Sequence, residues 1–240
     1  MEWRIRHKAV TESTNKDALG GTPGDVFVAE MQTAGRGRLD HKWLSPPGEN
    51  LMMSAVLDVA GVPLHEAATL PLVAGLSAAE AVQDILEAQC GASASGVKVK
   101  WPNDVHVRHR KICGILCERN GDSVIAGIGV NVNQTSFAAE ISDRATSVRL
   151  ETGNPVRVED VRDALLGRLS ANVERWRNDG FAALMPALSE FDSLKGRQVT
   201  VRRTDDDCAP ATGICGGIRP DGMLDVAGEA ISAGEAHILG

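Results

Sequence analysis

Aromatic residues are scarce in this chain of 240 residues: it contains no tyrosine, four phenylalanines and four tryptophans. Because large flat side chains are so few, the core must be packed mainly from Ala, Val, Leu and Ile. Two of the tryptophans, Trp43 and Trp101, lie in predicted loops. A loop tryptophan either plugs its own loop or offers a flat face to a purine or another bicyclic ligand, and the sequence leaves both interpretations open.

Long apolar runs are missing as well. No run approaches the ~20 residues that a membrane-spanning helix needs, and the amino terminus, MEWRIRHK, has charges where a signal peptide would have its apolar segment. The net charge of -7 argues against a general nucleic-acid-binding protein, which would need a basic face. These absences predict a cytoplasmic protein that binds neither membranes nor specific DNA.

The cysteines do not follow a pattern typical of a metal site or a disulfide framework. Cys113 and Cys117, four residues apart, would share one face of a strand without further ligands nearby. We therefore expect reduced thiols and no zinc site. The five cysteines are Cys90, Cys113, Cys117, Cys208 and Cys215.

Apolar residues recur at the spacing of strands and of helices in turn, which predicts an α/β (α+β) fold. Thr14, with Asp17 three residues later, predicts a capping-box-like start of the first helix, and Pro71 is tolerated in the long second helix only near its first turn. The expected strands span residues 4–10, 26–31, 50–59, 97–101, 105–108, 112–118 and 123–133. The expected helices span residues 15–19, 65–89, 158–178 and 182–191.

The composition changes near residues 194–196, where short alternating runs and turns replace the helices. We therefore expect two domains, residues 1–192 and residues 193–240. Fewer than fifty residues make little core alone, so the second segment is either a small β-barrel or an extension packed on the first domain. The expected short strands span residues 198–203, 212–217, 223–227 and 237–239.

The segment GRGRLDHKW, residues 35–43, alternates two arginines with glycines between two apolar runs. Glycine lets the backbone curl around a ligand, and a guanidinium offers paired donors to phosphate or carboxylate. Short Gly/Arg runs also occur as solvated turns or nucleic-acid tails. The flanking strands favour an anion-binding loop held on a rigid scaffold.

A second cluster follows at residues 97–118, where a strand is interrupted by WPND and returns through a basic turn. Lys111 stands at the start of an apolar strand, and Gly114 leaves room for a ligand beside it. Taken alone, Lys111 reads more readily as a solubilising residue at a hairpin tip, and Asp104 as a turn residue.

Together these segments resemble the biotin protein ligases, also called biotin–[acetyl-CoA-carboxylase] ligases. Bifunctional relatives carry a DNA-binding domain ahead of the first block, whereas Ser13 here leaves no room for one, so we expect the monofunctional type. The resemblance implies a catalytic domain like that of class II aminoacyl-tRNA synthetases and biotin/lipoate ligases, with a mixed sheet and packed helices, followed by an SH3-like β-barrel. The six blocks are ESTN (12–15), AEMQTAGRGR with KW (29–38, 42–43), SPPGENL (45–51), KWPND (100–104), KICGILCE (111–118) and GIGVNVN (127–133).

The resemblance implies a reaction in two steps. Biotin attacks the α-phosphorus of ATP to give biotinyl-5′-AMP and pyrophosphate, and a lysine of a biotin carboxyl carrier protein then displaces AMP. Because the first step brings two anions together, cations must neutralise them, and Mg²⁺ is expected to bridge phosphate oxygens without known protein ligands. The implied catalytic residues are Arg38, Lys111 and Asp104.

The same resemblance assigns the remaining contacts. Arg36 is expected to serve pyrophosphate or loop closure, and Trp43 to cover adenine. The implied biotin-binding residues are Ser13, Thr14, Asn15, Gln32, Gly35, Arg36, Gly37, Arg38, Lys111, Gly114 and Ile115. The implied ATP-binding residues are Arg36, Arg38, Trp43, Asn103, Lys111 and Asn131.

Two features depart from the family pattern. Relatives commonly continue the loop with glycine and arginine, whereas Leu39-Asp40-His41 follows Arg38 here and weakens the expected nucleotide contacts. Cys113 would place a thiol near the ligand. The rival functions are a lipoate or octanoyl transferase and a biotin-responsive repressor. An exposed edge strand would also allow a homodimer, which one chain cannot test.

Overall fold

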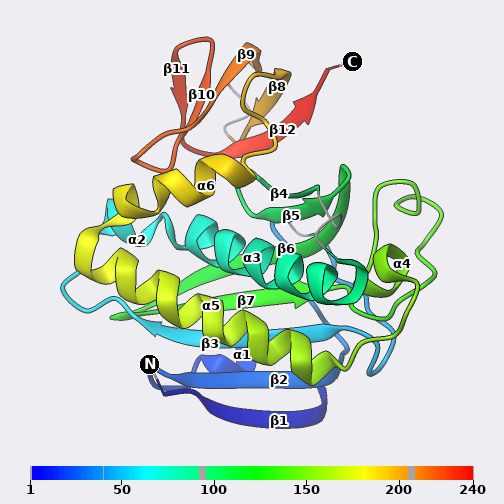
Figure 1. The fold of residues 1–240 in the computed structure, drawn as a ribbon. Coiled ribbons are helices and arrows are strands. Elements are labelled where there is room, and N and C mark those ends of the chain that lie inside the picture. Colours follow the sequence, from blue (N-terminus) through cyan, green and yellow to red (C-terminus); the bar gives the residue numbers. More distant parts are fainter. Residues whose placement is uncertain (1, 40, 92–95, 205–208, 240) are drawn as a thin grey trace.

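The computed structural model describes residues 2–39, 41–91, 96–204 and 209–239. Its larger part is a seven-stranded mixed sheet in the order β1-β2-β3-β7-β6-β5-β4 (Figure 1). In this sheet β1 and β2 are parallel, and the other neighbours are antiparallel. The strands are β1 (Arg4–Thr11), β2 (Asp25–Gln32), β3 (Leu51–Asp58), β4 (Val97–Lys100), β5 (Asp104–Val107), β6 (Arg110–Asn120) and β7 (Ser123–Val130).

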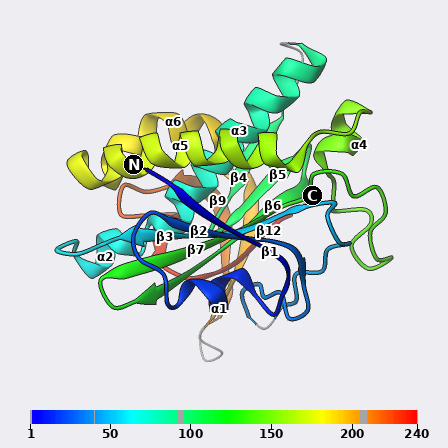
Figure 2. The same cartoon turned by 90° about the horizontal axis from the view of Figure 1, so that it is seen from below.

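Helices cover both faces of this sheet. The long helices α3 and α5 lie on one side and the short α1 on the other, as the view from below shows (Figure 2). Ala18 of α1 packs against Val56 and Ile125 on that second face. The helices are α1 (Thr14–Ala18), α2 (Leu64–Ala67), α3 (Leu70–Cys90), α4 (Val148–Thr152), α5 (Val158–Asp179) and α6 (Met185–Phe191), with a 3-10 turn, η1 (Phe181–Leu184), before α6.

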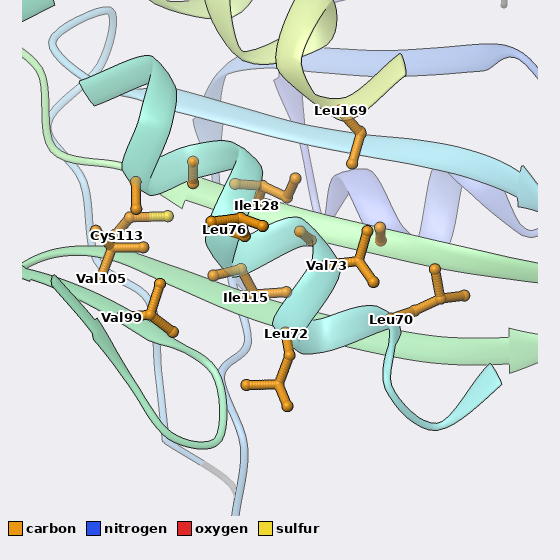
Figure 3. Close-up of a cluster of buried hydrophobic side chains, with 14 of the residues drawn as sticks. Leu70, Leu72, Val73, Leu76, Val99, Val105, Cys113, Ile115, Ile128 and Leu169 are labelled. Carbon is orange, nitrogen blue, oxygen red and sulfur yellow. The ribbon is translucent and has the colours of Figure 1, made fainter. Parts of the chain in front are cut away.

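The main core lies between α3 and the sheet. Leu72 and Leu76 of α3 belong to the same buried cluster as Val99 and Ile115 of the strands (Figure 3). Burying an aliphatic side chain of this size contributes about 1.5–3 kcal/mol to the free energy of folding. The aliphatic core predicted from the scarcity of aromatic residues is therefore confirmed, and it fixes the strands that carry the site.

Several predicted elements differ from the structure. The helix expected at 65–89 is divided into α2 and α3, because Pro71 lies in the first turn of α3 and its ring nitrogen has no hydrogen to donate to a preceding turn. The residue before the first helix is Ser13, whose side chain makes no capping hydrogen bond, so the capping-box prediction at Thr14 was wrong. Helix α4 and the short strand Glu229–Ile231 were not predicted. They have five and three residues, too few to show a clear periodicity.

The carboxyl-terminal part forms a five-stranded antiparallel sheet in the order β11-β10-β9-β8-β12. It joins the larger domain partly through Trp101, whose Nε1 donates to the carbonyl of Gly222 at 3.1 Å. The predicted fold class, a mixed-sheet domain followed by a small β domain, is confirmed, while the boundary at residue 192 stays a prediction. The strands are β8 (Gln198–Arg203), β9 (Ala211–Ile218), β10 (Leu224–Val226), β11 (Glu229–Ile231) and β12 (Gly234–Ile238).

Among the described residues, no helix has the length and apolar character needed to cross a membrane. Asp40 and Cys208 lie outside the described residues, so the expectations placed on them have no structural counterpart.

Candidate active site

A cavity of about 670 Å³ opens over the sheet, between the loop at 35–44 and the carboxyl-terminal domain. Gly35, a predicted site residue, is not part of its lining, but a Cβ at Gly35 would lie 2.5 Å from the carbonyl oxygen of Trp43, so the loop closes on itself there only with glycine. The other predicted site residues all line the cavity: Ser13, Thr14, Asn15, Gln32, Arg36, Gly37, Arg38, Trp43, Asn103, Asp104, Lys111, Gly114, Ile115 and Asn131.

Arg38 reaches across the cavity toward the second domain. Its Nη1 donates to Asn103 Oδ1 at 3.3 Å and to the carbonyl of Gly234 at 3.4 Å. Burial lowers the pKa of Arg38, and the nearby carboxylates Asp104 and Glu235 act in the opposite direction. A guanidinium that is partly desolvated and has no carboxylate partner among the described residues is well suited to bind an incoming anion.

Lys111 and Asp104 form an ion pair, with Lys111 Nζ 2.6 Å from Asp104 Oδ1. Burial raises the pKa of Asp104, but the charge of Lys111 and the hydrogen bond and charge of His106 outweigh burial and hold that pKa below its ordinary value. Asp104 is therefore ionised at neutral pH. In the absence of a ligand it neutralises and orients the Lys111 ammonium.

The position of Lys111 depends on a β-bulge. Asp104 and Val105 pair with Gly114 and Cys113, but the register then shifts, so that His106 pairs with Lys111. Residues three apart would face opposite sides of a regular strand. With the bulge, Lys111 and Gly114 both line the cavity, and a Cβ at Gly114 would lie 3.2 Å from Lys111 Nζ.

Two glycines form the floor under Trp43. A Cβ at Gly129 would lie 2.6 Å from Trp43 Cε2, and one at Gly114 would lie 3.0 Å from Trp43 Cζ3. The indole therefore rests directly on the sheet, and Lys111 Nζ lies 5.9 Å from its ring centroid. Trp43 Nε1 is buried and has no hydrogen-bond partner among the described residues. This unpaired donor and flat floor are suited to a planar ligand with an acceptor.

Short polar side chains fill the far end of the cavity. The amide of Thr14 donates to Gln32 Oε1 at 2.7 Å, and the hydroxyl of Ser54 lies 2.7 Å from Thr14 Oγ1 and 2.6 Å from Asn15 Oδ1. A Cβ at Gly127 would lie 2.1 Å from Asn15 Oδ1, so this asparagine fits only beside glycine. The result is a buried set of donors and acceptors in fixed positions.

Arg36 pairs with Glu118, the carboxylate that Asn15 of this polar end also binds. Its Nη2 lies 2.9 Å from both carboxylate oxygens of Glu118, and Asn15 Nδ2 donates to the same carboxylate at 2.6 Å. The loop is thereby tied to β6. This contact supports the loop-closure interpretation of Arg36 more than a contact with pyrophosphate.

The two asparagines expected near phosphate make hydrogen bonds within the protein. Asn103 Nδ2 donates to the carbonyl of Ile115 at 2.8 Å, and Asn131 Nδ2 donates to the carbonyl of Thr146 at 3.0 Å. Asn103 therefore holds Arg38 in place from its oxygen side. Both amides also line the cavity, where a ligand could reach them.

Sequence reasoning missed several groups that line the cavity. Lys100 is the most notable, because burial lowers its pKa, as do the charges of Lys111 and Arg144, while Asp104 and Glu235 act in the opposite direction. The pattern of KWPND could have pointed to Lys100, since it pairs with Asp104 across a hairpin. No local signal indicates the others, which come from distant segments: Phe137, Ile141, Arg144, Glu235 and His237.

One expectation about the site was wrong, and one open alternative is decided. Cys113 does not place its thiol in the cavity: it is fully buried in the core with Val105 and Leu76 (Figure 3), and burial raises its pKa. Of the two interpretations left open for Trp101, the structure favours packing: 2% of its surface is exposed, and its indole donates a hydrogen bond to Gly222 of the second domain. Among the described residues, no group of three or more His, Cys, Asp or Glu could hold a metal ion.

The chain is similar in sequence to several named proteins. The biotin–[acetyl-CoA-carboxylase] ligase of Paracoccus denitrificans is 35% identical, over 92% of this chain and 93% of its own length. The bifunctional ligase/repressor BirA of Escherichia coli is 31% identical over 90% of this chain. The chain spans 66% of the length of that relative and 45% of the length of BirA from Bacillus spizizenii.

A solved structure, the biotin protein ligase of Aquifex aeolicus in complex with biotin and ATP, superposes with a TM-score of 0.85. It is 30% identical in sequence, and the match covers 98% of this chain and 99% of that one. The model of the biotin/lipoate A/B protein ligase family matches residues 8–134, more than half of the sequence. The chain therefore belongs to the biotin/lipoate A/B protein ligase family.

Proposed function

We propose that this protein is an ATP-dependent biotin–[biotin carboxyl-carrier protein] ligase, which makes biotinyl-5′-AMP and transfers biotin to a lysine of the carrier. The observation that carries the proposal is the convergence of Arg38, Lys111 and Asp104 at one cavity whose floor is glycine. The relative from Paracoccus denitrificans, matched over 93% of its length, and the Aquifex aeolicus complex with biotin and ATP support this choice within the family.

In the first step Arg38 and Lys111 would hold the biotin carboxylate against the α-phosphate. The carboxylate oxygen attacks phosphorus, the bond to the bridging oxygen breaks, and pyrophosphate leaves. Like charges repel, so two fixed cations lower the energy of approach, and orientation supplies much of the remaining rate. Asn103 keeps Arg38 in place, and Asp104 keeps Lys111 in place until the phosphate arrives.

Biotin would replace the Trp43 indole over Gly114 and Gly129, with its ureido group toward the polar end of the cavity. Thr14 and Gln32 supply a donor and an acceptor at fixed positions, with Ser13 beside them. Asn15 is held by Glu118 and Ser54, so it shapes this end more than it contacts the ring. Ile115 lines the adjoining apolar wall.

In the second step Asp104 would receive the incoming carrier lysine. Once Lys111 binds the phosphate, the Asp104 carboxylate loses its partner and can hold the acceptor ammonium. Its pKa lies below the ordinary value, so it orients the amine more than it acts as a strong base. The ammonium first loses one proton to water. The amine nitrogen then attacks the biotinyl carbonyl carbon, AMP leaves with the anhydride oxygen, and the amide nitrogen loses its extra proton to water.

Magnesium would be held mainly by phosphate oxygens and water, the usual arrangement for Mg²⁺ with ATP. The side chains in reach are Asp104, which is paired with Lys111, and amide or carboxylate groups that do not cluster. The residues present therefore fit a phosphate-borne ion better than a site built by the protein, and no step above depends on one.

The carrier protein and the oligomeric state complete the proposal. The acceptor is the biotin carboxyl carrier protein of a carboxylase, and the enzyme would act in the cytoplasm.

Strand β1 is an edge strand whose Ile5 and Val10 are 43% and 57% exposed, which gives a homodimer a surface to use. Sedimentation velocity with and without biotinyl-AMP would test the dimer.

The direct test is a transfer assay with ATP, a carrier domain and either biotin or lipoate, read by intact mass. We expect the carrier mass to increase by one biotinyl group only with biotin and ATP. A carrier domain whose target lysine is replaced by arginine is the matched control. Transfer of lipoate at the rate of biotin, or no transfer of either, would contradict the proposal.

A further inference from the structure

We propose that Glu151 is a positioning residue for Lys111 and for the segment that faces it across the cavity. The Glu151 side chain is only 2% exposed, although it belongs to the short helix α4 near the surface. Its Oε1 accepts from Arg110 Nη2 at 2.7 Å and from Thr146 Oγ1 at 2.5 Å. Its Oε2 lies 3.4 Å from Arg108 Nη1.

These contacts join the two sides of a backbone bridge that carries Lys111. The amide of Lys111 donates to the carbonyl of Arg144 at 2.7 Å, and the amide of Thr146 donates to the carbonyl of Lys111 at 2.9 Å. Arg110 precedes Lys111 on one side of the bridge, and Thr146 belongs to the other. One carboxylate oxygen therefore binds both sides and holds them together.

The hairpin turn before Lys111 needs this support. Arg108 and His109 have φ angles of 48° and 70°, in the left-handed region that favours glycine. Both arginines of the turn converge on Glu151. The amide of Arg108 also donates to the carbonyl of Gly96 at 3.1 Å, so Glu151 adds a side-chain anchor to a strained turn that the backbone already holds in part.

The charge of Glu151 is a second reason to assign it a positioning role. The cavity already contains Lys100, Lys111 and Arg144: burial lowers the pKa of Lys100 most, and the charges of Lys111 and Arg144 lower it further. Glu151 neutralises Arg110 beside this group. Without the negative charge, Arg110 would add to the local positive field, and Lys111 would lose the fixed backbone that aims its side chain at Asp104.

The inference rests on the proposed role of Lys111 in adenylation. It predicts that loss of Glu151 affects the nucleotide step more than biotin binding. The polar end of the cavity, where biotin is proposed to bind, makes no contact with Glu151 among those the structure describes. Loss of Glu151 should therefore reduce the rate of adenylate formation and the apparent ATP affinity more than it reduces biotin affinity, because biotin keeps its contacts at the polar end.

The test compares Glu151→Gln and Glu151→Ala with Asp25→Asn. Asp25 is a matched control: its side chain is also 2% exposed and bound by two arginines and a threonine, but it lies on β2, beside the edge strand β1 and separated from β6 by β3 and β7. We expect Glu151→Ala to lower kcat/KM for ATP in biotin-dependent pyrophosphate release at least tenfold. Glu151→Gln, which keeps one acceptor oxygen, should lie between it and wild type. Biotin Kd should change less than kcat/KM for ATP in both Glu151 variants and should stay within twofold of wild type in Asp25→Asn.

Hydrogen exchange of the Lys111 amide gives a readout that does not need activity. It should accelerate at least tenfold in Glu151→Gln and stay at the wild-type rate in Asp25→Asn. The proposal is overturned if both Glu151 variants keep kcat/KM for ATP and Lys111 exchange within twofold of the control. A wild-type protein that releases no pyrophosphate with biotin would refute the ligase proposal instead, and the exchange comparison would still decide the role of Glu151.

Discussion

At the scale of single residues, the site is a set of cations whose partners are replaceable by a ligand. Lys111 has one carboxylate partner, and Arg38 has an amide oxygen and a backbone carbonyl. Neither arrangement is the strongest that these groups can make, since a bidentate carboxylate or phosphate would bind Arg38 more tightly. Lys111 and Arg38 are therefore held in place by partners that a ligand can replace.

We expect Arg38→Ala to weaken adenylation by about 2–4 kcal/mol in transition-state free energy, because a guanidinium aimed at two anions is lost. Lys111→Ala should be at least as damaging. Biotin-dependent pyrophosphate release, measured beside the thermal unfolding of each variant, separates this effect from a loss of fold. Wild-type rates in Arg38→Ala would refute the assigned role.

Asp104→Asn should separate the two half-reactions. The amide preserves the shape of the turn but not the charge, so adenylate should form at close to the wild-type rate while transfer to the carrier slows by roughly tenfold or more. Preformed enzyme-bound biotinyl-AMP, mixed with carrier domain, measures the second step alone. Unchanged transfer would leave Asp104 with the purely structural role of holding Lys111.

The sequence predicted the residues of the site better than their geometry. Family motifs marked Lys111 and Gly114, but their placement on the same face depends on a register shift that no local pattern indicates. Cys113 was placed near the ligand because its neighbours are, whereas strand alternation directs its thiol into the core. Glu151 gave no signal at all, because its partners Arg110 and Thr146 become neighbours only through the fold.

At the scale of elements, the loop at 35–43 is the part that a ligand should change most. It contacts the sheet through the Arg36–Glu118 pair and through Trp43 on its glycine floor. Leu39 and His41, by contrast, are exposed. Few apolar contacts offset the ordering entropy of about 1–2 kcal/mol per residue.

Amides of this loop and of Trp43 should gain protection from hydrogen exchange in the order ligand-free, biotin, biotinyl-AMP, because each ligand adds an anion or an apolar wall. Exchange followed by mass spectrometry on the same peptides measures it. The β3 and β7 strands, which are already paired, are the internal control. Full protection in the ligand-free protein would mean that the loop is preformed.

Strands β1 and β2 are joined by Asp25, and this joint should depend on pH. The amide of Thr22 lowers the pKa of Asp25 most, burial opposes it, and Arg4 and Arg6 lower it further. Because the folded-state pKa is depressed, the stabilisation is fully present above the unfolded-state pKa of about 3.9 and is lost as the pH falls below it.

Asp25→Asn should therefore lower the free energy of unfolding by about 2 kcal/mol at neutral pH, as expected for hydrogen bonds to a charged group. The difference from wild type should shrink below roughly pH 4. Urea unfolding from pH 3 to pH 7 measures it. A difference that stays constant across this range would show that the Asp25 charge contributes nothing.

At the scale of the whole molecule, the small domain completes the cavity. Arg38 donates to the carbonyl of Gly234, and Glu235 and His237 of β12 line the cavity wall. The sequence predicted a separate β domain, but not that its last strand would reach a loop almost two hundred positions earlier. Periodicity describes single elements, and the packing of two domains depends on contacts such as Trp101 with Gly222.

The most direct test of the central claim is a crystal structure of the protein grown with biotinyl-5′-AMP. We expect the acyl phosphate between Arg38 and Lys111, the biotin rings over Gly114 and Gly129, and the ureido group toward Thr14 and Gln32. Asp104 should then face the acyl carbon, released from Lys111. Adenylate bound outside this cavity, or with its phosphate away from both cations, would contradict the account.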